Sequence, residues 1–300
     1  MRLSIIAAAV LFAATPVMAQ DAMPTTGPAT GPAPETAASP PESEWRTVAP
    51  ENLLVIDTNR GRILVEMSPL AAPGHVERMR LLARNGFYDG LVWHRVIDWF
   101  MAQTGDPLGT GDGQSAYPDL TAELTFRRGA DMPFTPVADP MGAPVGFLGS
   151  LPIQTQPQEL MARTGDGMVH AWGVYCPGVA GMARGEAQDS ANSQFFLMRQ
   201  AYPSLDKRYT AWGRVISGLD VVRAIKTGEE PSGAVAAPQD IMTSVRVAAD
   251  IPAAQRPVAR VLDTASPTFG AMIEQTRAAR GADFSICDLE PPVDVIEPAA

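Results

Sequence analysis

The chain has 300 residues, of which 46% are hydrophobic and 19% charged, with a formal net charge of −10 at pH 7. This length and composition suffice for one large domain or two small ones with a well-buried core. The acidic balance, without any dense stripe of lysine or arginine, excludes nucleic acid from the expected partners, because phosphate backbones attract basic surfaces.

The first 19 residues have the pattern of a secretory signal peptide. Arg2 supplies the positive start, residues 3–14 are apolar, and Val17-Met18-Ala19 is a small-residue cleavage site. We therefore expect cleavage after Ala19 and an exported, periplasmic protein. The apolar run is shorter than the roughly 20 residues of a membrane-spanning helix, and no other segment is as apolar, so we expect no membrane insertion after cleavage.

Residues 20–50 are predicted to be a flexible linker. The segment 20–43 carries six prolines, no aromatic residue, and many alanines, threonines and glycines. Such a composition cannot bury enough apolar surface to offset the entropy lost on ordering. A proline-rich binding motif is disfavoured, because no PxxP pattern flanked by basic residues is present.

Folded sequence is predicted to begin with a β-hairpin. Two β-rich runs, residues 53–58 and 62–67, flank the tight-turn sequence Asn59-Arg60-Gly61. Pro73 then opens a predicted helix whose apolar residues share one face, and Asn85-Gly86 ends it.

One arginine lies among large apolar residues in the stretch 93–106. Residues 93–96 are predicted to be extended, which places Arg95 on the face opposite His94. Because the pKa of arginine stays above about 12 in proteins, Arg95 can donate hydrogen bonds or stabilise charge but cannot be a general base. A charged donor beside an apolar wall suits a neutral, amide-like ligand.

The glycine-rich segment 105–113 does not fit a phosphate-binding loop, because no lysine follows it and no predicted helix begins there. Asp106, Asp112 and Asp119 fail the spacing of a calcium loop and are interpreted as solvated loop acids. We expect neither a metal nor a cofactor, and we interpret His94 as a packed structural histidine.

Two later blocks offer further apolar, amide-rich surfaces. The first is Gly181-Met182-Ala183-Arg184, followed by residues 189–197; the second, residues 205–215, leads into a predicted helix at 219–226. Ser193 lacks a Gly-x-Ser-x-Gly context and assignable partners, so a hydrolase triad is disfavoured.

Together with the stretch containing Arg95, these blocks resemble the cyclophilin family of peptidyl-prolyl cis-trans isomerases over residues 51–250, apart from one insertion at about 127–173. The resemblance implies a mainly β fold, a closed antiparallel eight-stranded barrel capped by two helices. It also implies an isomerase that acts on proline-containing polypeptides, with the glycine-rich segment as the flexible loop beside the peptide groove.

The resemblance assigns a role to each candidate site residue. Arg95 matches the catalytic arginine of the family, and Gln103 matches the residue that holds the substrate backbone. The remaining substrate-binding positions are Phe100, Met101, Phe196 and Leu205 in the proline pocket, and Ala183, Arg184, Gln194 and Tyr209 in the rest of the groove. Arg184 and Tyr209 depart from residues common in eukaryotic members, and we expect catalysis to survive these changes.

The insertion, residues 127–173, is far longer than an ordinary connection and carries Phe134, Phe147 and Trp172. Its apolar content predicts a packed subdomain that folds against the barrel, with a helical turn at 157–162 and a strand at 169–175.

Residues 251–300 are predicted to be a C-terminal extension with a helix at about 266–280. Ser266-Pro267 is a capped helix start, and Phe269, Met272, Ile273 and Thr276 share one stripe before Gly281. The two cysteines, Cys176 and Cys287, would meet an oxidising compartment after export. We favour a disulfide between them over the alternative of two unpaired buried thiols.

Two functions stay open at this point. The first is an exported enzyme that isomerises X-Pro bonds in other exported proteins. The second is a catalytically weak, peptide-binding folding helper or scaffold that uses the same groove, partly covered by the insertion. The intact set of Arg95, Phe100, Gln103 and Phe196 favours the enzyme. We expect a monomer.

Overall fold

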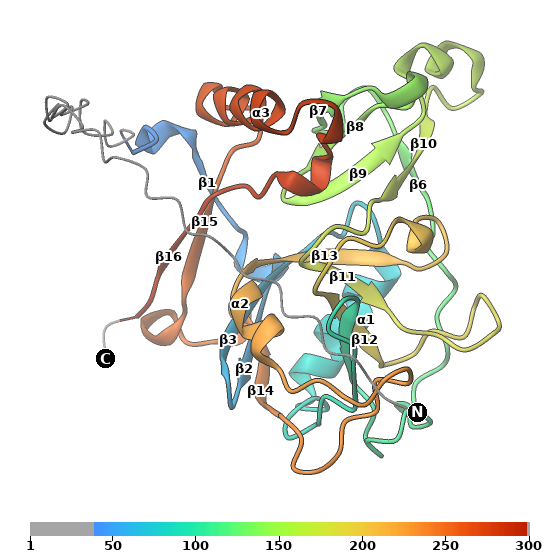
Figure 1. Ribbon diagram of the computed structural model, residues 1–300, viewed down its shortest axis with the longest axis vertical. Helices are drawn as coiled ribbons and strands as arrows, with labels where there is room; N and C mark the ends of the chain where they lie inside the picture. The colour runs from blue at the N-terminus through green and yellow to red at the C-terminus, as the bar shows by residue number, and fades with distance from the viewer. Residues whose placement is uncertain (1–38, 299–300) are drawn as a thin grey trace, which may run out of the picture. The chain divides into compact units, whose positions relative to one another are not determined.

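A computed structural model describes residues 39–298, so the predicted signal peptide and residues 20–38 of the predicted linker lie outside the described part. The central element is an antiparallel eight-stranded sheet with the strand order β14-β2-β3-β13-β11-β12-β5-β4 (Figure 1). Its strands are β2 (Leu53–Thr58), β3 (Gly61–Met67), β4 (Arg95–Val96), β5 (Met101–Thr104), β11 (Val179–Met182), β12 (Phe195–Met198), β13 (Ala211–Ser217) and β14 (Met242–Val247).

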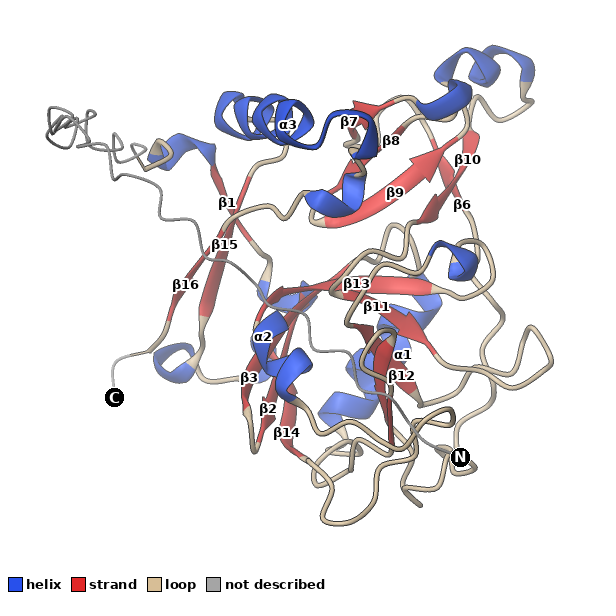
Figure 2. Cartoon of the chain, in the orientation of Figure 1, coloured by secondary structure: helices blue, strands red, loops and turns tan. Residues whose placement is uncertain are grey.

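The two edges of this sheet meet, which closes it into a barrel. Val92, just before β4, forms an antiparallel bridge with Ile241, just before β14. The backbone N–H of Trp93 also donates to the carbonyl of Asp240 at 2.9 Å. The predicted closed barrel is therefore confirmed, and strands predominate over helices throughout the described chain (Figure 2).

Two helices close the barrel core. The first, α1 (Pro73–Arg84), buries one face against the strands and is followed by Gly86 in the left-handed conformation, as the sequence predicts. The second, α2 (Leu219–Ala224), ends two residues before the predicted end. Its Val222 packs into the same cluster as Trp93, Phe195 and Trp212.

The insertion folds as a five-stranded sheet with the order β6-β10-β9-β8-β7. The strands are β6 (Phe126–Arg128), β7 (Thr135–Ala138), β8 (Val145–Leu148), β9 (Leu151–Thr155) and β10 (Val169–Gly173), with 3₁₀ turns η3 (Pro140–Gly142) and η4 (Gln158–Arg163). Phe147 and Ile153 share a buried cluster with Phe196 of the barrel. Sequence analysis predicted only β10 and the turn at η4, because the other strands are short and interrupted by proline and glycine.

The predicted linker is too long, since residues 42–47 form a 3₁₀ turn and a strand and a second 3₁₀ turn begins at Pro50. Strand β1 (Trp45–Thr47) pairs with β15 (Val258–Leu262), which pairs in turn with β16 (Val293–Ile296). The partner of β1 lies more than 200 residues away, so the local composition could not reveal it. The short 3₁₀ turns of both chain ends and of the barrel are η1 (Glu42–Glu44), η2 (Pro50–Asn52), η5 (Pro203–Leu205), η6 (Ala248–Asp250), η7 (Ala253–Gln255), η8 (Gly281–Asp283) and η9 (Ile286–Asp288).

The C-terminal extension contains the helix α3 (Pro267–Arg280). Its N-cap is Ser266, whose hydroxyl accepts a hydrogen bond from the N–H of Phe269. Phe269 packs edge-on against Phe147 of the insertion, with ring centroids 5.6 Å apart. The extension is therefore packed on the insertion as well as paired with β1.

Two links fasten the tail to the barrel. Cys176 and Cys287 form a disulfide with their Cα atoms 4.9 Å apart. The buried guanidinium of Arg214 on β13 donates to the carbonyls of Ser150 and Leu289 at 3.2 and 3.3 Å. Within residues 39–298, no helix has both the length and the apolar character needed to span a membrane.

Candidate active site

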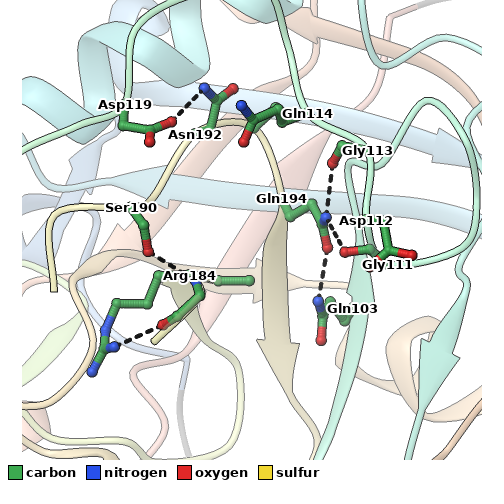
Figure 3. Close-up of a pocket in the computed structure, with 13 residues that line it drawn as sticks. Gln103, Gly111, Asp112, Gly113, Gln114, Asp119, Arg184, Ser190, Asn192 and Gln194 are labelled. Carbon is green, nitrogen blue, oxygen red and sulfur yellow. Dashed lines mark hydrogen bonds between the residues drawn. The ribbon is translucent and has the colours of Figure 1, made fainter. Parts of the chain in front are cut away.

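One cleft on the barrel brings together most of the predicted site. It has a volume of about 180 Å³ and is lined by Arg95, Phe100, Met101, Gln103, Ala183, Arg184, Phe196, Leu205 and Tyr209. These residues come from β4, from β5 and the residue before it, from the residues just after β11, from β12, and from η5 and the loop after it. The remaining predicted residue, Gln194, lines an adjoining pocket of about 330 Å³ that shares Gln103, Ala183 and Arg184 with the cleft (Figure 3).

Arg95 and Gln103 lie directly opposite each other in the β4–β5 pair. Because directly paired residues project to the same face of a sheet, their side chains meet. Nη1 of Arg95 donates to Oε1 of Gln103 at 3.1 Å, and Nε donates to the carbonyl of Ser232 at 3.0 Å. Nη1 also lies 3.9 Å from Sδ of Met101. These contacts engage Nε and Nη1, so the two N–H groups of Nη2, which have no hydrogen-bond partner among the described residues, can serve a ligand in the cleft.

The Arg95 guanidinium is half-buried beside apolar surface. Its carbon lies 6.0 Å from the centroid of the Phe100 ring. Burial lowers the pKa of Arg95, yet an arginine remains charged at neutral pH. The neighbouring His94 is buried, burial lowers its pKa, and neither ring nitrogen has a hydrogen-bond partner among the described residues. This environment agrees with a packed histidine.

A relay of amides joins Gln103 to the glycine-rich loop. Nε2 of Gln103 donates to Oε1 of Gln194 at 2.9 Å. Nε2 of Gln194 then donates to the carbonyls of Gly111 and Gly113, each at 2.8 Å (Figure 3). The relay fixes the orientation of both amide groups and holds the loop against the cleft.

Asp106 corrects one interpretation from the sequence, because it is only 1% exposed rather than solvated. Its carboxylate accepts hydrogen bonds from the N–H groups of Leu108 and Thr110 at 2.7 and 2.8 Å. Burial raises the pKa of Asp106, but these and neighbouring amide hydrogen bonds outweigh burial and bring the pKa below its usual value. Asp106 therefore organises the glycine-rich loop from within. Because an aspartate often accepts hydrogen bonds from the backbone that follows it in a turn, the Asp-Pro-Leu-Gly sequence could have indicated this role of Asp106.

The apolar wall of the cleft rests on aromatic neighbours. Phe196 stacks on Tyr175 with centroids 5.9 Å apart and meets Tyr209 edge-on at 5.8 Å. A Cβ atom at Gly181 would lie 2.4 Å from the Phe196 ring, so glycine is required beneath this wall. Sequence analysis missed Tyr175, because it lies outside the three blocks that carry the resemblance.

Arg184 lies at the rim between the two pockets. Its guanidinium donates to the carbonyls of Gly185 and Arg208 at 2.9 and 3.1 Å, and its carbon lies 4.8 Å from the Tyr209 ring centroid. The structure thus places all ten predicted residues at the cleft or the adjoining pocket, while their roles stay predictions. Over residues 39–298, no three His, Cys, Asp or Glu side chains are grouped so as to hold a metal ion.

Comparisons with known proteins agree with this architecture. The family model described as "Cyclophilin type peptidyl-prolyl cis-trans isomerase/CLD" matches residues 53–247. A probable peptidyl-prolyl cis-trans isomerase of Brucella suis is 34% identical over 205 residues, which are 64% of this chain and 81% of that protein. Peptidyl-prolyl cis-trans isomerase B of Bacillus subtilis is 29% identical over 186 residues, covering 62% of this chain and 90% of that protein.

A solved structure extends the likeness beyond the barrel. The crystal structure of cyclophilin AquaCyp293 from Hirschia baltica has a TM-score of 0.77 and 33% identity, and covers 85% of this chain and 95% of that one. The fold and these relatives define the protein as an isomerase. The chain belongs to the cyclophilin-type family of peptidyl-prolyl cis-trans isomerases, and this family binds proline-containing peptides.

Proposed function

We propose that the protein is exported and accelerates rotation about X-Pro bonds in other exported proteins, by stabilising the twisted imide without a covalent step. The observation that carries the mechanism is the half-buried Arg95, hydrogen-bonded to Gln103 over an apolar cleft. The signal pattern of residues 1–19 and the Cys176–Cys287 disulfide support export, because disulfides persist in oxidising compartments.

To accelerate X-Pro isomerisation, a site needs only to stabilise the twisted imide selectively. Delocalisation of the nitrogen lone pair creates a rotation barrier of about 18 to 20 kcal/mol. The cis and trans X-Pro isomers lie within about 1 kcal/mol of each other, yet uncatalysed exchange takes tens to hundreds of seconds. A site that binds the twisted state more tightly than either planar state therefore accelerates exchange in both directions.

Arg95 provides such selectivity. In the twisted state the imide nitrogen becomes pyramidal and recovers its lone pair, which can accept a hydrogen bond from the guanidinium. Phe196, Met101 and Leu205 would hold the proline ring, while Gln103 would bind the neighbouring backbone. The donor is already oriented by Gln103 and Ser232, so little reorganisation is required during the rotation.

The open cleft favours the enzyme over the inactive folding helper. All nine lining residues come from the barrel, and none belongs to the insertion at 127–173. The described part of the insertion thus supports the proline pocket from behind, where Phe147 and Phe196 share a cluster.

A protease-coupled assay on an X-Pro peptide tests the mechanism. Arg95→Ala should lower kcat/KM by roughly 100-fold or more, as expected for the loss of a preorganised donor. Arg84→Ala is the matched control, because Arg84 ion-pairs with Glu51 and Asp250 away from the cleft. Equal rates for wild type and Arg95→Ala would contradict the mechanism and favour the peptide-binding helper.

Export has its own test. The full chain, expressed in a Gram-negative host, should appear in the periplasmic fraction with Gln20 as its first residue. An unprocessed chain that stays with the cytoplasmic fraction would contradict the proposed export without affecting the isomerase mechanism.

A further inference from the structure

Lys207 has an unusual backbone conformation for its residue type. Its φ is +59°, and it is the one non-glycine residue with positive φ between residues 39 and 298. In this region the Cβ of an L-residue crowds the backbone, whereas glycine enters it freely. Lys207 lies between Leu205 and Tyr209, both of which line the cleft. The strain therefore lies in the loop that forms one wall of the proline pocket.

The Lys207 side chain reaches the insertion. Its ammonium lies 4.1 Å from the centroid of the Trp172 ring, a distance that gives a favourable cation–π contact. Trp172 belongs to β10 and is largely buried, so its position is fixed by the packing of the insertion. The contact therefore links a side chain of this loop to a firmly packed residue of the insertion.

The chain just after β10 makes one contact with the same loop and one with Tyr202, just before the loop. The N–H of Tyr175 donates to Oδ1 of Asp206 at 2.9 Å, and the carbonyl of Tyr175 accepts from the N–H of Tyr202 at 2.8 Å. The Tyr175 ring also stacks on the ring of Phe196 in the pocket wall. Residues 172–175 thus form one continuous backing for the pocket wall.

We infer that Trp172 and Lys207 are positioning residues for X-Pro isomerisation: their contact holds the loop from Leu205 to Tyr209 in the conformation that shapes the proline pocket. The inference rests on the proposed isomerase mechanism. It gives the insertion a function at the site, although no described residue of the insertion lines the cleft.

The kinetic test separates positioning from mere stability. Lys207→Gly relieves the backbone strain and removes the cation, so its Tm should equal or exceed that of wild type. Its KM for an X-Pro peptide should nevertheless rise about two- to fivefold with a smaller change in kcat. Lys207→Arg keeps the cation and should retain wild-type KM.

Variants of Trp172 complete a double-mutant cycle. Trp172→Leu should also raise KM, and the increase in the double variant should be smaller than the two single effects combined, because both changes remove the same cation–π contact. Trp172→Phe keeps an aromatic face and should fall between wild type and Trp172→Leu. Trp172→Phe also controls for unfolding, because it removes less buried volume than Trp172→Leu does.

The lysine content of the chain allows a direct test of the contact. Lys207 and Lys226 are the two lysines of the sequence. Reductive ¹³C-methylation preserves their charge and gives one methyl signal for each in NMR. The Lys207 signal should be shifted upfield by the Trp172 ring and should return to the ordinary position in Trp172→Leu. The Lys226 signal should not move, because its ammonium binds the carbonyls of Ala236 and Pro238.

The outcomes distinguish the inference from the function on which it rests. An active wild type that loses activity in Arg95→Ala but is unaffected by Lys207→Gly and Trp172→Leu would overturn the positioning role alone. An unshifted Lys207 signal would overturn the contact itself. An inactive wild type, equal to Arg95→Ala, would contradict the proposed function.

Discussion

Arg95 and Gln103 face each other across one strand pair, and the guanidinium donates to the amide oxygen at 3.1 Å. That bond leaves the amide nitrogen of Gln103 to donate to Gln194. One glutamine therefore orients the arginine on one side and the glycine-rich loop on the other.

Gln103→Glu should disturb both partners. A carboxylate would bind the Arg95 guanidinium more strongly and would no longer donate to Gln194. Since a hydrogen bond to a charged group is worth about 1.5 to 3 kcal/mol, kcat/KM should fall roughly 10- to 100-fold. Gln158→Glu, on the exposed turn η4, adds the same charge away from the cleft and should leave activity unchanged. A fully active Gln103→Glu enzyme would show that the orientation of Arg95 is unimportant.

Asp206 should give the fold a distinct dependence on pH. Burial raises the pKa of Asp206 to about 6, from an ordinary value of 3.8. A carboxyl group with a raised pKa contributes stability that is complete below about pH 4 and lost as the pH rises through 6. The shift corresponds to at most about 3 kcal/mol, and solvent reduces this figure because the group is only partly buried.

Asp206→Asn keeps the acceptor for Tyr175 and removes the ionisation. The Tm of wild type, relative to this variant, should therefore decrease between pH 4 and pH 7.5 in thermal denaturation. A constant difference across this range would show that the pKa of Asp206 is not raised in the folded protein.

The Cys176–Cys287 disulfide should contribute substantially to stability. It joins residues 111 positions apart, and restricting the unfolded chain over such a loop is worth about 4 to 5 kcal/mol at most. The double variant Cys176→Ser, Cys287→Ser should lower the free energy of unfolding in urea by several kcal/mol. Wild type unfolded with reductant is the control and should show the same loss, whereas unreduced, denatured wild type should have no titratable thiols.

Arg214 should stabilise the junction of barrel, insertion and tail. Its buried guanidinium serves the carbonyls of Ser150 and Leu289, and burial lowers its pKa to about 10, so it stays charged at neutral pH. Arg214→Met leaves both carbonyls without this donor and should cost about 1 to 3 kcal/mol per lost bond. Arg246→Met, which removes a partly exposed, bidentate pair with Asp89, should cost less, because solvent screens this pair. Equal losses in the two variants would contradict the special role of Arg214.

Elements held together by local interactions were predictable from the sequence, and elements that depend on distant residues were not. The hairpin, α1 and α3 were predictable, because turn, cap and periodic apolar residues lie within each segment, as with Ser266 and Phe269. The cleft was predictable from three motifs whose residues converge only in the folded barrel, so the resemblance supplied what spacing alone could not.

The missed features depend on distant partners or on fine geometry. Strand β1 forms because β15 pairs with it, and no residue pattern within 42–52 indicates that partner. Asp106 appears solvated from its glycine-rich surroundings, but the loop closes over it. The conformation of Lys207 and its contact with Trp172 depend on how the insertion packs, which no local pattern encodes.

The three-stranded sheet of β1, β15 and β16 also determines how the enzyme can be handled. It packs on the outer face of β2 and β3, where Ala259 and Val261 meet Val55 and Leu64. Around the barrel, β2 lies four strands from β12, which carries Phe196, and β3 lies four strands from β5, which carries Gln103. An affinity tag or a resin linker joined at the exposed Ile296 of β16 would therefore lie on the side of the barrel away from Phe196 and Gln103, and the cleft of the immobilised enzyme would stay open to unfolded chains.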